Sequence, residues 1–421
     1  MFKKDSLIKN ISVLVTGTVI AQIIPVALQP ILKRLFTPED FGVFEIYLKT
    51  LGILFVIFAM KYDMAIILPK NKIKALLILS LSISFALFFT LISYLLLLFF
   101  DTEIMNLLRF PIKYKIALYL LPLSTLFFSG FNAFNYLLIR NKKFKASSIN
   151  KINRRASEGI SQIGLAYSPI LKHIGLFIGN MLGNVIYFLS AYYQSFKGFK
   201  FDKRFFNPRT LLHISKEYSD LPKYNIIPEL LNAGFFAALS FLVLSKFNIQ
   251  EVGYMELTQR ILAIPTAFIA YSVGQVLLQK TSELVNTKQK LTPEIKKVFL
   301  LLLAMVLPFI FIILFFSAPI FSFAFGKEWV ISGLYAKYLV VFYAMGFLIS
   351  PLSQTLISLQ KFKINAIWKI GRFILIIPIF FISFEKIDSY LITYSILGIV
   401  SYIIYFIIIF YHSKKFDKTL Q

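Results

Sequence analysis

Apolar stretches of about 20 residues recur along the whole chain, and each is long enough to cross a bilayer as a helix. Short polar connections separate them, apart from one longer connection at 197–221. We therefore predict an all-α polytopic membrane protein with 12 transmembrane helices, at approximately 11–32, 41–60, 74–100, 114–139, 146–166, 173–196, 223–245, 252–278, 297–318, 331–357, 364–383 and 389–412.

Composition excludes several functional classes. A net charge of +25 in a soluble chain would suggest nucleic-acid binding, but 58% hydrophobic and 15% charged residues do not make a soluble surface, so we expect no nucleic-acid partner. The absence of cysteine excludes a disulfide scaffold and a thiolate metal site. With three scattered histidines, we expect no metal centre and no cofactor.

The positive charge indicates the orientation of the chain. Of the 45 lysines and arginines, 27 fall in one set of alternate connections and termini and nine in the other. Because cytoplasmic loops are enriched in these residues, we predict that both termini are cytoplasmic. The first apolar stretch is too long for the core of a cleaved signal peptide and is read as a retained span of a multi-pass protein.

An internal repeat indicates duplication. The segment Asp40–Lys49 aligns with Glu251–Arg260, and Lys143–Arg154 aligns with Lys361–Arg372 with seven identities in twelve positions. We predict two pseudo-symmetric six-helix lobes in parallel orientation, an arrangement used by secondary transporters with a site between the halves. The predicted division is an N-lobe at 1–196, a basic cytoplasmic linker at 197–221, and a C-lobe at 222–421.

Cations recur within the spans at repeat-related positions. They fall about 13–14 Å into a hydrocarbon core about 30 Å thick, and each costs about 2.5–3.5 kcal/mol there. We expect them to line a hydrated cavity between the lobes and to bind a phosphate or diphosphate. The six candidate substrate-binding cations are Lys49, Lys151, Arg154, Arg260, Lys369 and Arg372.

Internal ion pairing is the alternative reading of these charges. Glu45 precedes Lys49 by four residues and Glu256 precedes Arg260 by four, a spacing that favours pairing on a helix. For these two cations, local pairing and ligand contact are equally plausible and compatible. The ion-pair or coupling candidates are Glu45, Asp63, Glu158, Glu229 and Glu256.

Amide side chains accompany prolines on the first, fourth and seventh spans. Amides suit sugar hydroxyls, although for each amide taken singly a helix–helix hydrogen bond is the favoured explanation. The candidates for a polar cavity lining are Gln22, Gln29, Asn132, Asn135, Asn225 and Asn232.

Three segments carry a resemblance to the polysaccharide flippases, the Wzx-type O-antigen and capsule transporters of the MOP (MATE-like) superfamily. They are Arg34–Phe44, Lys61–Lys70, and Tyr218–Asn225 together with Glu251–Tyr254 and positions near 260–276. At Lys61 and Asp63 the family more often has Arg and Glu. The resemblance covers the first eight spans well and the last four mainly through hydropathy and the repeat.

The resemblance implies a V-shaped pair of lobes that flips an undecaprenyl-diphosphate-linked oligosaccharide, used for lipopolysaccharide or capsule, across the bacterial inner membrane. Other partners would be membrane lipids and other glycan-assembly membrane proteins. Proton or sodium coupling stays open. The alternatives are a MATE-like transporter of a drug or a peptidoglycan precursor and, less favoured, a glycan polymerase or acyltransferase. We expect no enzymatic activity, because no sizeable loop or His/Asp/Glu cluster is present.

Overall fold

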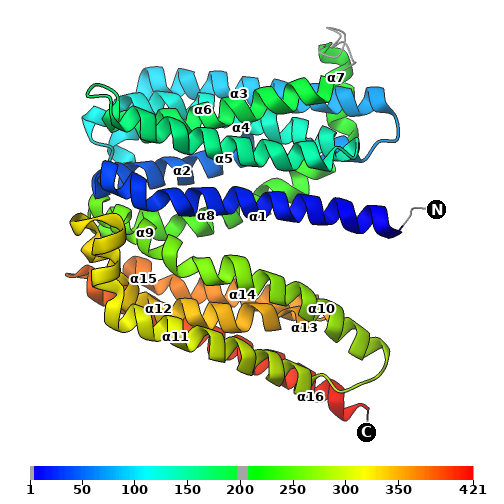
Figure 1. Ribbon diagram of the computed structural model, residues 1–421. Helices are drawn as coiled ribbons and strands as arrows, with labels where there is room; N and C mark the ends of the chain where they lie inside the picture. Colours follow the sequence, from blue (N-terminus) through cyan, green and yellow to red (C-terminus); the bar gives the residue numbers. More distant parts are fainter. Residues whose placement is uncertain (1–3, 197–206, 421) are drawn as a thin grey trace. The chain divides into compact units, whose positions relative to one another are not determined.

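The computed structural model describes residues 4–196 and 207–420, and within these ranges every regular element is helical. Contacts group the chain into two compact units, 1–244 and 245–421 (Figure 1).

The first unit is built around long helices, with α5 packed between α1 and α6 and with α4 against α3 and α6. Its elements are α1 (Lys4–Leu35), α2 (Pro38–Phe58), η1 (Tyr62–Ile67), α3 (Lys72–Leu107), η2 (Ile112–Tyr114), α4 (Lys115–Arg140), α5 (Phe144–Ala166), η3 (Lys172–Ile174), α6 (Gly175–Phe196), α7 (Pro208–Glu217) and α8 (Asp220–Lys246), whose last two residues pass into the second unit.

The second unit places α12 against α9, α11 and α16, while α14 packs on α16. Its elements are α9 (Ile249–Pro265), the π-helical turn η5 (Thr266–Ala270), α10 (Tyr271–Asn286), α11 (Thr292–Phe325), η6 (Lys327–Trp329), α12 (Val330–Leu352), α13 (Gln354–Ser358), α14 (Phe362–Ile376), α15 (Pro378–Phe381) and α16 (Ile387–Lys418). The π-turn directly follows Pro265, which cannot donate a backbone hydrogen bond.

Each predicted span coincides with a helix or with consecutive helical segments, which confirms the all-α prediction for the described residues. Eight helical segments there are long and apolar enough to cross a membrane: Pro38–Phe58, Lys72–Leu107, Ile112–Arg140, Lys172–Phe196, Thr292–Phe325, Lys327–Ser358, Lys363–Phe381 and Ile387–Lys418. The charged helix α5 and the interrupted α9–α10 are not among them. The count of 12 and the cytoplasmic termini stay predictions.

The repeated acids hold the starts of equivalent helices in place. Thr37 and Asp40 form a reciprocal capping box at the start of α2, and the Tyr114 hydroxyl donates to Asp40 Oδ1 at 2.6 Å. In the second unit, Asn248 caps α9 and the Tyr335 hydroxyl donates to Glu251 Oε2 at 2.5 Å. The first acid of the repeat is therefore a structural anchor.

Small residues allow the polar helix α5 to be enclosed. A Cβ built on Gly183 of α6 would lie 2.9 Å from Glu158 Cβ and 3.1 Å from the Arg154 carbonyl oxygen, both on α5. On the other side of α5, a Cβ on Gly159 would collide with Leu28 of α1. These close approaches enclose the Glu158 carboxylate of α5 within the unit.

The predicted linker begins outside the described residues at 197–206, and its later part forms α7. Leu211 and Ile214 of α7 are buried against the first unit's core, and Tyr62 donates to the Ser215 carbonyl oxygen at 3.0 Å. The domain boundaries predicted from the repeat stay a prediction, while the contact grouping divides the chain after Leu244.

Candidate functional site

The two predicted local ion pairs form at repeat-equivalent positions. Lys49 Nζ lies 3.0 Å from Glu45 Oε1 on α2, and Arg260 pairs with Glu256 on α9. In each pair the carboxylate is buried, whereas its cation is partly exposed. The i,i+4 spacing that predicted pairing is thus confirmed, and each pair leaves part of the cation accessible.

Arg154 lies against aromatic rings instead of a carboxylate. Its guanidinium carbon is 4.7 Å from the ring centroid of Phe128 on α4 and 5.4 Å from that of Tyr187 on α6. These distances are typical of cation–π contacts, in which the negative ring face attracts the cation.

Arg372 in the second unit has the same surroundings. Its guanidinium carbon is 5.8 Å from the Phe342 ring on α12, 4.9 Å from the Tyr402 ring on α16 and 5.6 Å from the Trp368 ring. Its Nη1 also donates to the Tyr402 hydroxyl at 3.3 Å.

The two arginines therefore lie in equivalent aromatic cages. Each cage takes one ring from the fourth predicted span of its half and one from the sixth. Among residues 4–196 and 207–420, neither Arg154 nor Arg372 is ion-paired with a carboxylate, and the Nε of each is buried without a hydrogen-bond partner. No acid in the described part of either unit forms an ion pair with these two arginines, and the Glu158 charge, which is paired with Arg155, acts on Arg154 only at longer range.

The lysines that precede these arginines differ in exposure. Lys151 is half-buried on α5, whereas Lys369 is exposed on α14. The repeat places both lysines one turn before their arginine, as predicted.

Glu158 on α5 belongs to a buried polar network. It accepts a 2.7 Å hydrogen bond from Asn180 Nδ2 and pairs with Arg155 Nη1 at 2.9 Å. Asn184 and Ser124 extend the network, with Asn184 Nδ2 donating to Ser124 Oγ at 2.8 Å. The carboxylate therefore forms its ion pair with Arg155, and its charge also acts on Arg154 without a direct contact.

Three predicted residues gather around Lys61. Its Nζ lies 3.6 Å from Glu229 Oε2 on α8, and Asn132 Nδ2 donates to Asp63 Oδ2. The Lys61 charge also acts on Asp63, which is 1% exposed. Lys61 adopts a left-handed backbone conformation (φ 59°), which non-glycine residues rarely adopt. Distant segments of the chain thus assemble one polar cluster.

Burial raises the pKa of the Asp63 carboxyl, because the charged form loses solvation, while the nearby Lys61 charge opposes the rise. The Oδ1 atom of Asp63 is buried without a hydrogen-bond partner among the described residues. Asp63 therefore has a buried carboxylate oxygen within the cluster that could bind a proton.

The remaining predicted amides are engaged locally or exposed. Gln29 Nε2 donates to the Pro25 carbonyl oxygen at 3.3 Å, Asn225 Nδ2 donates to the Leu221 carbonyl oxygen at 3.0 Å, and Ser147 Oγ donates to Asn135 Oδ1 at 2.5 Å. Gln22 is exposed. The side chain of Asn232 lies outside the described residues. Their role in lining a cavity stays a prediction.

Sequence reasoning missed the aromatic residues of the cages and the partners of Glu158. The four-residue spacing of Asn180 and Asn184 on α6 was a signal for a polar helix face. The cage rings had no such signal, since Phe and Tyr are abundant throughout this chain.

No group of three metal-ligating side chains occurs in the part of the chain that the structure describes. Two surface hollows lie in the second unit, one at the start of α11 and one beside α13 and α16, and neither is lined by a predicted cation.

Comparison with known proteins gives the family and the fold. Residues 31–332 match the family model described as "Polysaccharide biosynthesis protein". No curated protein matches by sequence. Three similar solved structures are all below 25% identity, so the likeness shows the fold alone.

The first is a multidrug resistance MATE family transporter of the MOP superfamily in its inward-facing conformation, with TM-score 0.72, 14% identity, and coverage of 96% of this chain and 99% of that one. The second is the lipid II flippase MurJ in an inward closed conformation, with TM-score 0.68, 18% identity, and coverage of 97% and 90%. The third is a mutant of the Vibrio cholerae MATE transporter VcmN, with TM-score 0.54, 12% identity, and coverage of 98% and 97%. The chain therefore belongs to the polysaccharide biosynthesis protein family and has the all-helical fold of MOP superfamily transporters.

Proposed function

We propose that the protein moves a polyprenyl-diphosphate-linked oligosaccharide, such as an O-antigen or capsule repeat unit, across the bacterial inner membrane by alternating access. Membership of the polysaccharide biosynthesis family supports a glycan cargo, and the MOP transporter fold supports transport. One similar structure is named a lipid II flippase, which supports a lipid-linked cargo. The proposal includes 12 spans with both termini in the cytoplasm.

The observation that carries the proposal is the pair of equivalent arginines, Arg154 and Arg372, that form no ion pair with an acid among the described residues. A cation in a membrane-spanning helix costs about 2.5–3.5 kcal/mol. A cation–π contact with an aromatic face stabilises the cation by about 0.5–2 kcal/mol, which is less than that cost. A duplicated arrangement that holds arginines without neutralising them suits binding of an anion, and the planar guanidinium matches phosphate oxygens.

The other candidate residues have supporting parts in this proposal. Lys49 and Arg260, each paired with its own glutamate, and Lys151 and Lys369 add positive charge around the diphosphate and glycan. No cofactor is required. Proton or sodium coupling would use Asp63, Glu158 or Glu229, and Asp63 and Glu229 already share the cluster around Lys61.

A cationic drug fits the charges less well, because the caged arginines would repel it. A peptidoglycan precursor carries the same diphosphate and differs from the proposed cargo in its glycan. A glycan polymerase or acyltransferase would form product in the absence of transport. The protein is thus proposed to be a transporter without enzymatic activity.

Complementation of glycan export tests the proposal. A bacterial strain lacking its own flippase would receive the wild-type protein, Arg154→Ala, Arg372→Ala or the double variant. Loss of a charge-assisted contact worth about 1.5–3 kcal/mol predicts about 10- to 100-fold less export for each single variant. Substitution by lysine keeps the charge but loses the planar fork, so we expect partial export.

Arg209→Ala is the matched control, because Arg209 is exposed on α7 and belongs to neither cage. It should export normally at equal expression. Wild-type export by the double variant at normal membrane levels would refute the role of the caged arginines. Glycan polymer made by the purified protein would instead favour an enzyme.

A further inference from the structure

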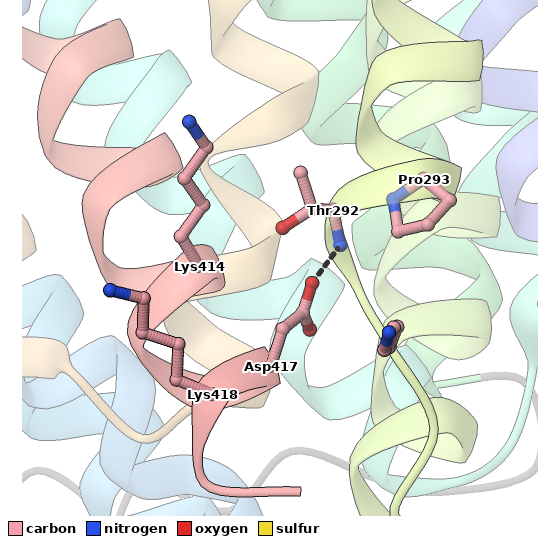
Figure 2. A pocket seen from close by; sticks show the side chains of 6 residues that line it. Thr292, Pro293, Lys414, Asp417 and Lys418 are labelled. Carbon is pink, nitrogen blue, oxygen red and sulfur yellow. Dashed lines mark hydrogen bonds between the residues drawn. The ribbon is translucent and has the colours of Figure 1, made fainter. Parts of the chain in front are cut away.

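A lysine-lined hollow in the second unit is lined by none of the residues predicted to take part in transport. It forms where the C-terminal end of α16 meets the start of α11 and has a volume of about 310 Å³. This is at the lower end of the range of small-molecule sites, about 300–1,000 Å³. Its lining residues are Lys290, Thr292, Pro293, Lys414, Asp417 and Lys418 (Figure 2).

The Asp417 carboxylate in this hollow accepts hydrogen bonds from backbone N–H groups. One Asp417 oxygen accepts from the Leu291 N–H at 2.7 Å and the other from the Thr292 N–H at 3.0 Å. Figure 2 shows the second of these bonds joining α16 to the start of α11. Asp417 thus fixes the two helix ends together and contributes one negative charge among three lysines.

The donors around the hollow exceed its acceptors. Lys414 and Lys418 lie four residues apart on α16 and therefore share a helix face, and Lys290 lines the hollow from the other chain segment. The Thr292 hydroxyl oxygen is buried and has no hydrogen-bond partner among the described residues. Three ammonium groups and a hydroxyl suit the oxygens of a phosphate group.

The helix that starts at the hollow has an apolar surface suited to acyl chains. Only 17% of the most apolar window of α11 is buried, the second-lowest fraction among the candidate spans. Leu300, Leu301 and Leu307 are each more than half exposed. They follow Thr292 by 8 to 15 residues, about 12–23 Å along the helix. Polar donors at the helix start and exposed leucines farther along match the two ends of a phospholipid.

We propose that this hollow binds the phosphate headgroup of an anionic phospholipid, with the acyl chains lying along α11. Basic clusters at the cytoplasmic ends of membrane helices attract anionic lipids, and the positive-charge bias predicts that the hollow faces the cytoplasm. The bound lipid would join α11 to α16 beside the contact made by Asp417. This site is separate from the caged arginines and does not depend on the proposed cargo.

Native mass spectrometry of the purified full-length protein tests this site, with phosphatidylglycerol, phosphatidylcholine and inorganic phosphate as probes. We compare Lys414→Ala/Lys418→Ala with Lys296→Ala/Lys297→Ala, which removes two exposed lysines of α11 that do not line the hollow. At about 1 kcal/mol for each lysine, the first variant should bind phosphatidylglycerol about 30-fold more weakly. The control variant should stay within about threefold of wild type, because its lysines act only at a distance.

Thr292→Val provides a test that leaves the charge unchanged. It should weaken phosphatidylglycerol binding several-fold, since it removes only the hydroxyl donor. Phosphatidylcholine should bind weakly to all variants. Equal loss in the two lysine variants would overturn the proposal, and so would displacement of phosphatidylglycerol by an equal concentration of inorganic phosphate. Gel filtration verifies that each variant is folded before binding is measured.

Discussion

Gly183→Ala tests whether the close approach of α6 to α5 encloses the charged helix. The added Cβ would lie 2.9 Å from Glu158 Cβ and 3.1 Å from the Arg154 carbonyl oxygen, so the two helices must separate by several tenths of an ångström. Overpacking of this kind costs about 1–3 kcal/mol. Alanine stabilises a helix interior by about 0.5–1 kcal/mol relative to glycine, so the net loss of stability should be about 1–2 kcal/mol.

Gly164→Ala is the matched control on the neighbouring helix α5. A Cβ there meets nothing within 4 Å, so the substitution should keep the propensity gain of about 0.5–1 kcal/mol. The two variants should then differ by about 1.5–3 kcal/mol. For a unit of 244 residues this corresponds to roughly 3–12 °C in Tm.

Size-exclusion chromatography after heating measures this difference in detergent. Thiol-reactive dyes do not apply, because the chain has no cysteine. Both tryptophans, Trp329 and Trp368, lie in the second unit, so their fluorescence does not report on the first. Equal apparent Tm values for Gly183→Ala and Gly164→Ala would refute the reasoning about the α5–α6 contact.

Two further predictions concern the tyrosine hydroxyls that anchor helix starts and the buried carboxyl of Asp63. Tyr114→Phe and Tyr335→Phe should each cost about 1.5–3 kcal/mol, because each removes a hydroxyl that donates to a carboxylate; an unchanged Tm in both would contradict the anchoring role of Asp40 and Glu251. The folded pKa of Asp63 is raised, so the folded state retains this proton to higher pH than the unfolded state. Asp63 therefore lowers stability as pH rises from about 4 toward its folded pKa, and Asp63→Asn should flatten the pH dependence of Tm there. A steeper pH dependence of Tm in Asp63→Asn would contradict the raised pKa of Asp63.

Local features of this fold follow from the sequence. Hydropathy predicted the helix positions, because every span must satisfy its backbone hydrogen bonds within itself. The spacing of Glu45 with Lys49 and of Glu256 with Arg260 predicted their ion pairs, since residues four apart share a helix face. These features depend on neighbours within about one helical turn.

Features that join distant helices were not predictable from spacing. The rings around Arg154 come from α4 and α6, which the sequence separates from it by about one span each, and nothing in their spacing distinguishes Phe128 from other phenylalanines. The pairing of Lys61 with Glu229 likewise joins segments 168 positions apart. The repeat predicted that Arg154 and Arg372 are equivalent, and the structure adds the aromatic surroundings that the two share.

Reconstituted transport tests the central claim most directly. Vesicles would hold the purified protein and an undecaprenyl-diphosphate-linked oligosaccharide in both leaflets, and an added glycosidase would digest only the outward-facing glycan. We predict that wild-type protein exposes the inner-leaflet glycan to digestion and that Arg154→Ala/Arg372→Ala protein does not. Digestion limited to the outer leaflet with wild-type protein, as in protein-free vesicles, would contradict the proposed flippase activity.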